Sequence, residues 1–186
     1  MIGIVLAGGQ SKRFGTDKAT YQLGSLNASN VQLAVSKLLP FCEQVVVSVN
    51  QKNQQAICKQ LRAFPRTILV GDLPPFDQHG PLSGLLAVTK HFPGRHDYLM
   101  VAVDYPFLRS ETIQALARHQ QTVITTGDHL HYSLAHFRTD YQTINTWLMD
   151  NNWRLGAFLT ECCRCQPLSF PQRQEFTNLN YLNKKE

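Results

Sequence analysis

The pattern of apolar and polar residues divides the chain into short apolar runs separated by longer amphipathic stretches. The apolar runs, rich in β-branched residues, predict strands at Gly3–Leu6, Val45–Val49, Thr67–Val70, Tyr98–Val103, Thr122–Thr125 and Ser133–Phe137. In the first run no polar residue alternates with the apolar ones, which is typical of a strand buried on both faces. Such strands occur in parallel sheets that helices cover on both sides.

Most segments between these runs have the spacing of helices. In residues 30–39 the apolar positions 31, 34, 35, 38 and 39 form one stripe, which Pro40 ends. Ser110 is expected to cap its helix, with Glu111 in the first turn. The expected helices are Asn30–Leu39, Gln51–Phe64, Pro81–Phe92, Ser110–His119 and Thr139–Asp150. This alternation predicts an α/β fold, a Rossmann-like three-layer sandwich over residues 1–186, with a mostly parallel sheet and helices on both faces.

Composition places the chain among globular proteins. At 186 residues, with 43% hydrophobic and 17% charged residues, it is most simply one domain with a substantial core. The net charge of +5 is modest, and no basic run is long enough to predict a nucleic-acid partner. The longest apolar stretches have the length of strands, so no membrane span is expected. The first strand begins without the pattern of a signal peptide, which predicts a cytoplasmic protein.

The cysteines and histidines form no pattern typical of a metal site. Cys162, Cys163 and Cys165 are crowded, but they lack the usual C-x2-C spacing of zinc ligands. They are either metal ligands or free thiols near the end of a late helix or strand, and the spacing favours free thiols. His129 and His131 alternate along a possible strand edge and are expected to face solvent.

Glycines and cations follow the first strand at once, in the stretch LAGGQSKRFGTDK at residues 6–18. Gly8 and Gly9 permit backbone conformations and close approaches that other residues hinder. Free N–H groups and fixed cations after a buried strand suit an anion such as a polyphosphate. A basic surface turn fits the composition equally well. The stretch is neither a G-x-x-x-x-G-K-[ST] loop nor G-x-G-x-x-G.

Three later strands are followed by a polar residue, namely Asn50, Asp72 and Asp104. Ligands of parallel sheets bind at the carboxyl ends of the strands, where these side chains are expected. Asp104 after a buried strand predicts a magnesium ligand, because hard cations prefer oxygen. The alternative is that Asp104 caps a helix beginning near Phe107. Asp72 is either a ligand contact or a turn residue.

A second glycine-bearing stretch, HGPLSG, lies at residues 79–84. Pro81 suits the first position of a helix, where its missing N–H is no loss. Gly80 and Gly84 allow that helix start to approach either a ligand or another part of the fold.

Together these stretches resemble the molybdenum cofactor guanylyltransferases, the molybdopterin-guanine dinucleotide biosynthesis protein A family of the nucleotidyltransferase superfamily. The N-terminal signature of that superfamily, L-A-G-G-x-S-x-R-[MF]-G-x-D-K, stands here at residues 6–18. Further matches follow in order as V-S-V-N at 47–50, G-P-L-S-G at 80–84, A-V-D-Y-P-F-L at 102–108 and F-T-N-L-N at 176–180. The resemblance covers nearly the whole chain.

The resemblance implies a magnesium-dependent enzyme that transfers GMP from GTP to the terminal phosphate of a molybdopterin cofactor and releases pyrophosphate. It implies Lys18, Arg13 and Asp104 as catalytic residues, with Asp104 as the Mg²⁺ ligand. The nucleotide contacts that it implies are Leu6, Ala7, Gly8, Gly9, Arg13, Lys18, Asn50 and Asp72, with Asp72 accepting hydrogen bonds from guanine. The residues implied on the cofactor side are Gly80, Pro81, Asn178 and Asn180. Implied partners are molybdoenzymes or cofactor-delivery proteins, with no membrane and no nucleic acid.

Two stretches depart from the family's pattern. Residues 24–30 lack its Lys-Pro pair, and residues 181–183 stand where the family has Thr-Pro-Glu-Asp. Two other functions therefore stay open. One is a related transferase that uses CTP or a sugar or alcohol phosphate acceptor, and the other is a non-catalytic carrier of nucleotide or cofactor.

Overall fold

A computed structural model of the chain describes residues 1–9, 14–24, 26–77 and 80–179. Its strands are β1 (Ile2–Leu6), β2 (Gln44–Val49), β3 (Thr67–Gly71), β4 (His96–Ala102), β5 (Thr122–Thr126), β6 (His129–Thr139) and β7 (Gln166–Phe170). They form a seven-stranded sheet in the order β3-β2-β1-β4-β6-β5-β7. The first four are parallel, β6 is antiparallel to β4 and β5, and β7 is parallel to β5. The mostly parallel sheet is confirmed.

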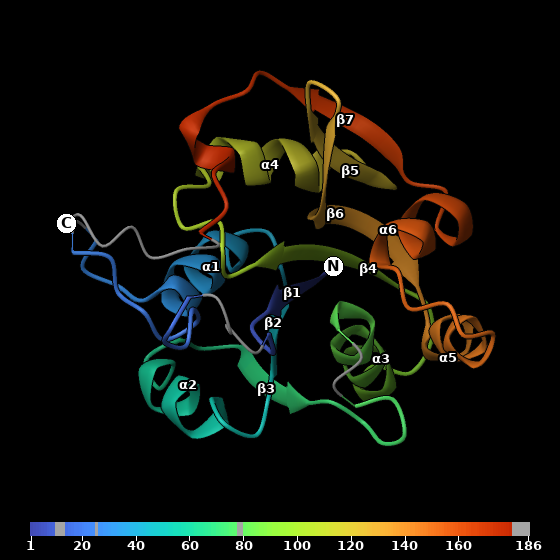
Figure 1. Ribbon diagram of the computed structural model, residues 1–186, viewed down its shortest axis with the longest axis horizontal. Helices are drawn as coiled ribbons and strands as arrows, with labels where there is room; N and C mark the ends of the chain where they lie inside the picture. Colours follow the sequence, from blue (N-terminus) through green and yellow to red (C-terminus); the bar gives the residue numbers. More distant parts are fainter. Residues whose placement is uncertain (10–13, 25, 78–79, 180–186) are drawn as a thin grey trace.

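Helices cover both faces of this sheet (Figure 1). They are α1 (Asn30–Leu38), α2 (Gln54–Gln60), α3 (Pro81–His91), α4 (Ser110–Arg118), α5 (Tyr141–Met149) and α6 (Leu155–Ala157), with a π-helix at Phe158–Cys162 and a 3₁₀ turn at Gln174–Phe176. Residues of α1, α2 and α4 pack into one apolar cluster, and residues of α3, α5 and α6 pack into a second cluster. The predicted three layers are therefore present. No helix in the described ranges is long and apolar enough to cross a membrane.

The last strand was not predicted. β7 lies at the edge of the sheet, and its sequence QPLSF has exposed and half-buried positions only. Pro167 removes one backbone donor, which is tolerated on an edge strand. An apolar run is the signal of a buried strand, so this exposed strand gave none.

Two helix starts differ from the prediction. Ser110 is not the cap of α4, because Arg109 occupies the N-cap and Ser110 is the first helical residue. The carboxylate of Glu175 instead accepts hydrogen bonds from Arg109 N (3.0 Å) and Thr112 Oγ1 (2.7 Å). Since α4 begins at Ser110 and Glu175 occupies its N-terminus, Asp104 does not cap this helix.

The other helix whose start differs is α5. It begins at Tyr141 and not at Thr139, which belongs to β6. Asp140 caps it by accepting a hydrogen bond from Thr143 N at 2.7 Å. The helix predicted over residues 51–64 is shorter, Gln54–Gln60.

The prediction for the two alternating histidines is half wrong. His129 is exposed as expected, but His131 is only 5% exposed. Phe176 from the C-terminal segment packs against the His131 ring, with centroids 5.4 Å apart. Tyr105 approaches the same ring from the loop after β4, at 5.7 Å. The face of β6 that carries His131 is therefore covered by segments distant in sequence, which local alternation does not reveal.

Candidate functional site

The carboxyl ends of β1, β2 and β4 bring several predicted residues together. Leu6 pairs with Ser48 on one side and Ala102 on the other. Hydrogen bonds continue one residue beyond β1, since Ala7 N donates to Ser48 O (2.9 Å) and Val103 N donates to Leu6 O (3.2 Å). The loops after these strands, which carry Gly8, Asn50 and Asp104, therefore meet at one edge of the sheet.

The loop after β1 is held in place by two asparagines of the next strand's loop. Asn50 Nδ2 donates to the carbonyl of Gly8 (3.0 Å). Asn53 Nδ2 donates to Ala7 O (2.8 Å) and to Asp17 Oδ2 (3.0 Å), and Asn53 is 2% exposed. Asn53 was missed by the sequence-based reasoning, because an Asn three residues beyond a strand resembles an ordinary turn residue.

Asp17 orders the turn that carries Lys18. Its Oδ1 accepts hydrogen bonds from the backbone of Ala19 (2.9 Å) and Thr20 (3.2 Å). Lys18 is half-buried, and its Nζ lies 5.8 Å from the centroid of the Phe14 ring. Asp17 thus has a structural explanation in the described contacts, whereas Lys18 presents a cation at the edge of the sheet. Arg13 lies outside the described residues.

The backbone beside this cation is open. Gly9 is exposed, and a side chain built there would meet no atom of the described residues within 4 Å. Gly15 has φ +81°, a conformation that glycine adopts without strain. The described residues therefore leave the space beside Gly9 open.

Asp104 lies on the neighbouring loop, with its Oδ1 atom buried and without a hydrogen-bond partner among the described residues. Burial raises the pKa of its carboxyl, while a side-chain hydrogen bond from Asn178 and the charge of Lys18 act to lower it. Buried polar atoms are nearly always paired in native proteins, so an unpaired carboxylate oxygen at this edge of the sheet is a candidate ligand atom. An anionic oxygen near the surface fits Mg²⁺, which binds through one or two carboxylates together with substrate phosphates.

The C-terminal segment supplies a second group to this loop. Leu179 N donates to Asp104 O at 2.9 Å, which fixes the segment beside β4. Asn178 is half-buried, and its Oδ1 atom has no partner among the described residues. The structure thus joins Asn178 to Asp104, two residues far apart in sequence. Asn180 lies outside the described residues.

The start of α3 closes the site on the side of β2 and β3. Gly80 has φ +88° at the N-cap, and Pro81 occupies the first helical position as predicted. Gly84 packs so closely on β2 that a side chain there would collide with Ser48. The Asp72 carboxylate lies near the same point, 3.8 Å from a Cβ built on Gly84. Close packing therefore accounts for Gly84, and Asp72 stands at the carboxyl edge where it was expected.

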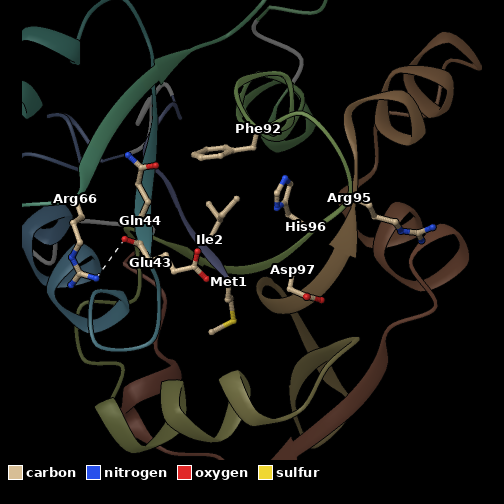
Figure 2. A pocket seen from close by; sticks show the side chains of 9 residues that line it. All are labelled: Met1, Ile2, Glu43, Gln44, Arg66, Phe92, Arg95, His96 and Asp97. Carbon is tan, nitrogen blue, oxygen red and sulfur yellow. Dashed lines mark hydrogen bonds and ion pairs between the residues drawn. The ribbon is translucent and has the colours of Figure 1, made fainter.

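A pocket of about 370 Å³ lies at the opposite, amino edge of β1, β2 and β4. Figure 2 shows Ile2, Phe92 and His96 around it, with the Arg95 side chain directed away from them. Arg66 is engaged in the fold, because its Nη1 donates to Cys42 O at 3.0 Å and to Glu43 O at 3.5 Å. The dashed line in Figure 2 marks the bond to Glu43. The pocket thus lies away from every predicted site residue.

The crowded cysteines lie apart from the carboxyl edge. Cys162, Cys163 and Cys165 are free thiols, and burial is the main cause that raises the pKa of each. Cys162 ends the π-helix, while Cys165 directly precedes β7. Among the described residues no three of His, Cys, Asp and Glu gather as a metal site.

Residues 3–161 match the family model described as MobA-like NTP transferase domain. A probable molybdenum cofactor guanylyltransferase from Mycobacterium tuberculosis is 30% identical over 189 residues, covering 97% of this chain and 89% of that protein. The crystal structure of molybdopterin-guanine dinucleotide biosynthesis protein A from Archaeoglobus fulgidus superimposes with a TM-score of 0.64 at 18% identity, covering 98% of this chain and 93% of the other. A nucleotidyl transferase from Methanothermobacter gives 0.72 at 16% identity, covering 97% and 91%. The two structures show the fold, and the sequence matches show the family.

Proposed function

This chain belongs to the MobA-like NTP transferase family, and from that premise we propose that it transfers GMP from GTP to the terminal phosphate of molybdopterin. An oxygen of the acceptor phosphate attacks the α-phosphorus of GTP, and the bond to the β-phosphate breaks. The products are the guanine dinucleotide cofactor and pyrophosphate. The proposal covers residues 1–186 as one nucleotidyltransferase domain.

One observation carries this proposal more than any other. The unpaired, buried Oδ1 of Asp104 lies at the same sheet edge as the open glycine loop and Lys18. Asp17, a carboxylate with a structural role in the neighbouring loop, is by contrast hydrogen-bonded through both of its oxygens. A carboxylate that awaits a metal keeps an oxygen free.

The groups of the site divide the work of binding and catalysis. Transfer of a phosphoryl group depends on positioning and charge neutralisation more than on a covalent nucleophile. Lys18 and Arg13 hold the triphosphate and stabilise the charge that develops on the departing pyrophosphate. Backbone groups of the loop bind base and phosphates, at Leu6, Ala7, Gly8 and Gly9. Asp72 accepts hydrogen bonds from guanine, which favours GTP over the other nucleotides.

Asp104 is the residue that holds the metal in this proposal. The positive charge of Lys18 acts to lower the pKa of the Asp104 carboxyl and so favours its ionised form. Asp104 would hold Mg²⁺ there, and the metal would supply Lewis-acid chemistry and positive charge for the phosphates of GTP. Asn178 orients the Asp104 carboxyl through its side-chain hydrogen bond.

Asn50 contributes to nucleotide binding through the loop after β1. Its amide donates to the carbonyl of Gly8, so it supports the nucleotide through the loop. Gly80, Pro81, Asn178 and Asn180 form the side that faces the pterin. Proteins that accept or deliver the finished cofactor are the proposed partners, because a labile product is best passed on by direct contact.

A transfer assay with four nucleotides tests this function. The protein is incubated with molybdopterin, Mg²⁺ and GTP, CTP, ATP or UTP, and both pyrophosphate and the pterin dinucleotide are measured. GTP is expected to give both products, and chelation of Mg²⁺ is expected to abolish them. Product with CTP only would move the protein to a cytidylyl activity, and nucleotide binding without either product would indicate a carrier.

A further inference from the structure

Three buried groups near Asp104 have no role in the chemistry above. His131 on β6 is 5% exposed, Tyr105 after β4 is 7% exposed, and Thr126 at the end of β5 is 6% exposed. They come from three separate elements and meet behind the Asp104 loop. Polar side chains of this kind are costly to bury unless they are hydrogen-bonded.

The three groups form a hydrogen-bonded chain. The Tyr105 hydroxyl lies 3.1 Å from His131 Nδ1, and the Thr126 hydroxyl lies 2.8 Å from His131 Nε2. A neutral imidazole has one donor and one acceptor, and each hydroxyl can take either part. The chain is therefore complete with either tautomer of His131. Burial, with the neighbouring His129 second, lowers the pKa of His131 to about 4, so the neutral form is present at physiological pH.

One end of this hydrogen-bonded chain, Tyr105, is next to Asp104 in the sequence. Tyr105 follows Asp104 in sequence, so an anchored phenol fixes the backbone of the loop. A side-chain hydrogen bond from Asn178 lowers the pKa of both Tyr105 and Asp104, although burial raises both pKa values overall. Asn178 therefore lies close enough to both groups to affect their pKa values.

The His131 ring also packs against the C-terminal segment that carries Asn178. Phe176 lies against the His131 ring at 5.4 Å with an interplanar angle of 32°, two residues before Asn178. His131 therefore contacts both chain segments that determine where the Asp104 carboxyl points. The strands behind it, β5 and β6, are interior strands that lie between β4 and β7 in the sheet.

We propose that His131 is a positioning residue for Asp104, acting through Tyr105 to anchor the carboxylate's loop to β5 and β6. This inference rests on the proposed role of Asp104 as the Mg²⁺ ligand. It predicts that loss of the hydrogen bonds between Tyr105, His131 and Thr126 reduces the gain in nucleotide affinity that Mg²⁺ gives. The affinity for nucleotide without Mg²⁺ is expected to stay unchanged. A histidine that merely fills space would affect stability only.

The test measures the dissociation constant of GTP by titration calorimetry, once with Mg²⁺ and once with a chelator. The ratio of the two constants is the magnesium enhancement, and Asp104→Asn gives its lower limit. Tyr105→Phe removes one hydroxyl and keeps the ring, so the fold is expected to survive. A hydrogen bond of ordinary strength predicts that the enhancement falls about three- to tenfold in this variant.

Variants of His131 distinguish a residue that positions the Asp104 loop from one that only fills space in the core. His131→Leu is expected to reduce the enhancement as much as Tyr105→Phe, and the double variant no further, because both break one chain. His131→Gln, which keeps a donor and an acceptor, is expected to recover part of the enhancement. The matched control is His136→Gln, since His136 is a buried histidine of the same strand that bonds instead to Leu116 O of α4 (3.2 Å).

The outcomes distinguish this inference from the function on which it rests. If Asp104→Asn lowers the enhancement but Tyr105→Phe equals the wild type, the positioning role is wrong and the metal site stands. If Asp104→Asn also equals the wild type, Asp104 does not hold the metal, and both proposals fall. Equal losses in His136→Gln and His131→Leu would likewise overturn a specific role for His131.

Discussion

The loops after β1 and β4 are neighbours at one edge of the sheet, and they differ in whether their polar atoms are hydrogen-bonded. In the loop after β1 the carbonyls of Ala7 and Gly8 accept hydrogen bonds from Asn53 and Asn50, and Asp17 is bonded through both oxygens. In the loop after β4 the Oδ1 of Asp104 is buried without a partner among the described residues. The described polar groups Ala7 O, Gly8 O and the Asp17 carboxylate of the first loop are thus hydrogen-bonded, whereas the second loop has a carboxylate oxygen without a partner.

This difference separates residues that hold the site from residues that work in it. A satisfied hydrogen bond stabilises the fold, so its loss is expected to lower stability first. An unpaired buried carboxylate lowers stability in the absence of ligand, so its loss is expected to raise stability while activity falls. Substitution of Asn53, which bonds the loop after β1, and substitution of Asp104 should therefore change stability in opposite directions.

Asp104→Asn is expected to have the largest effect. Loss of a metal ligand should remove several kcal/mol of transition-state stabilisation, so that transfer falls about 10³-fold. The same change removes a buried charge, and the melting temperature of the metal-free protein should rise by about 2 to 4 °C per kcal/mol gained. Transfer assays and calorimetric melting measure the two effects. Lower stability together with lower activity would place Asp104 among the scaffold residues.

The stability gain of Asp104→Asn should depend on pH. Because the pKa of Asp104 is raised in the fold, its ionised form is disfavoured there relative to the unfolded chain. The wild type therefore loses stability as the pH rises through the raised pKa, and the loss is absent below the ordinary range of aspartate. The melting difference between variant and wild type is expected near neutral pH and should vanish in acid. A difference in melting temperature that grows towards acid pH would contradict a raised pKa of Asp104.

Lys18→Ala is expected to have the next largest effect. Removing a cation that stabilises developing charge should lower transfer about 10²- to 10³-fold while the melting temperature stays close to the wild type. Lys52→Ala is the matched control, because Lys52 is exposed in the loop after β2. Near-normal turnover of Lys18→Ala would remove this residue from the catalytic groups.

Asn53→Ala is expected to show the effect of losing a residue that stabilises the loop after β1. The change leaves Ala7 O and Asp17 Oδ2 without a donor, and it should lower the free energy of unfolding by about 1 to 3 kcal/mol. Activity should fall less than in Asp104→Asn, because the ligand groups remain. Gln55→Ala, an exposed position of α2, is the control. Denaturant unfolding measures the loss, and an unchanged midpoint would contradict the scaffold role.

Asp72→Ala is expected to have the smallest effect on the overall rate and a specific one on the choice of base. Loss of an acceptor for guanine should reduce the preference for GTP over CTP by about 10- to 100-fold, since a hydrogen bond to a charged group contributes about 1.5 to 3 kcal/mol. Competition between the two nucleotides measures the ratio. An unchanged preference would assign guanine recognition to other residues.

The sequence predicted the parts of the site that depend on strand ends. Gly8, Asn50 and Asp104 each follow a buried parallel strand, and parallel strands bring their carboxyl ends to one edge. Most strands were predicted from their apolar runs, and the layers were predicted from the alternation of these runs with helical segments. Asn178 was placed near the site only through the family motif, since no local pattern joins it to Asp104.

The misses share a physical cause. Asn53 and His131 acquire their contacts from segments distant in the chain, and a residue's own neighbours carry no information about such contacts. β7 is an edge strand whose exposed residues give no apolar run. Glu175 caps α4 from the C-terminal segment, so the helix start lacked a local signal and was assigned to Ser110.

The most direct test of the account is the melting temperature of the wild type and Asp104→Asn with GTP, CTP, ATP or UTP, each with and without Mg²⁺. A ligand at about a hundredfold above its dissociation constant stabilises a fold by about 2.7 kcal/mol, a shift of several degrees. The account predicts that GTP with Mg²⁺ gives the largest shift in the wild type, and that Asp104→Asn loses the part due to Mg²⁺. No shift with any nucleotide, or the same Mg²⁺ effect in both proteins, would contradict it.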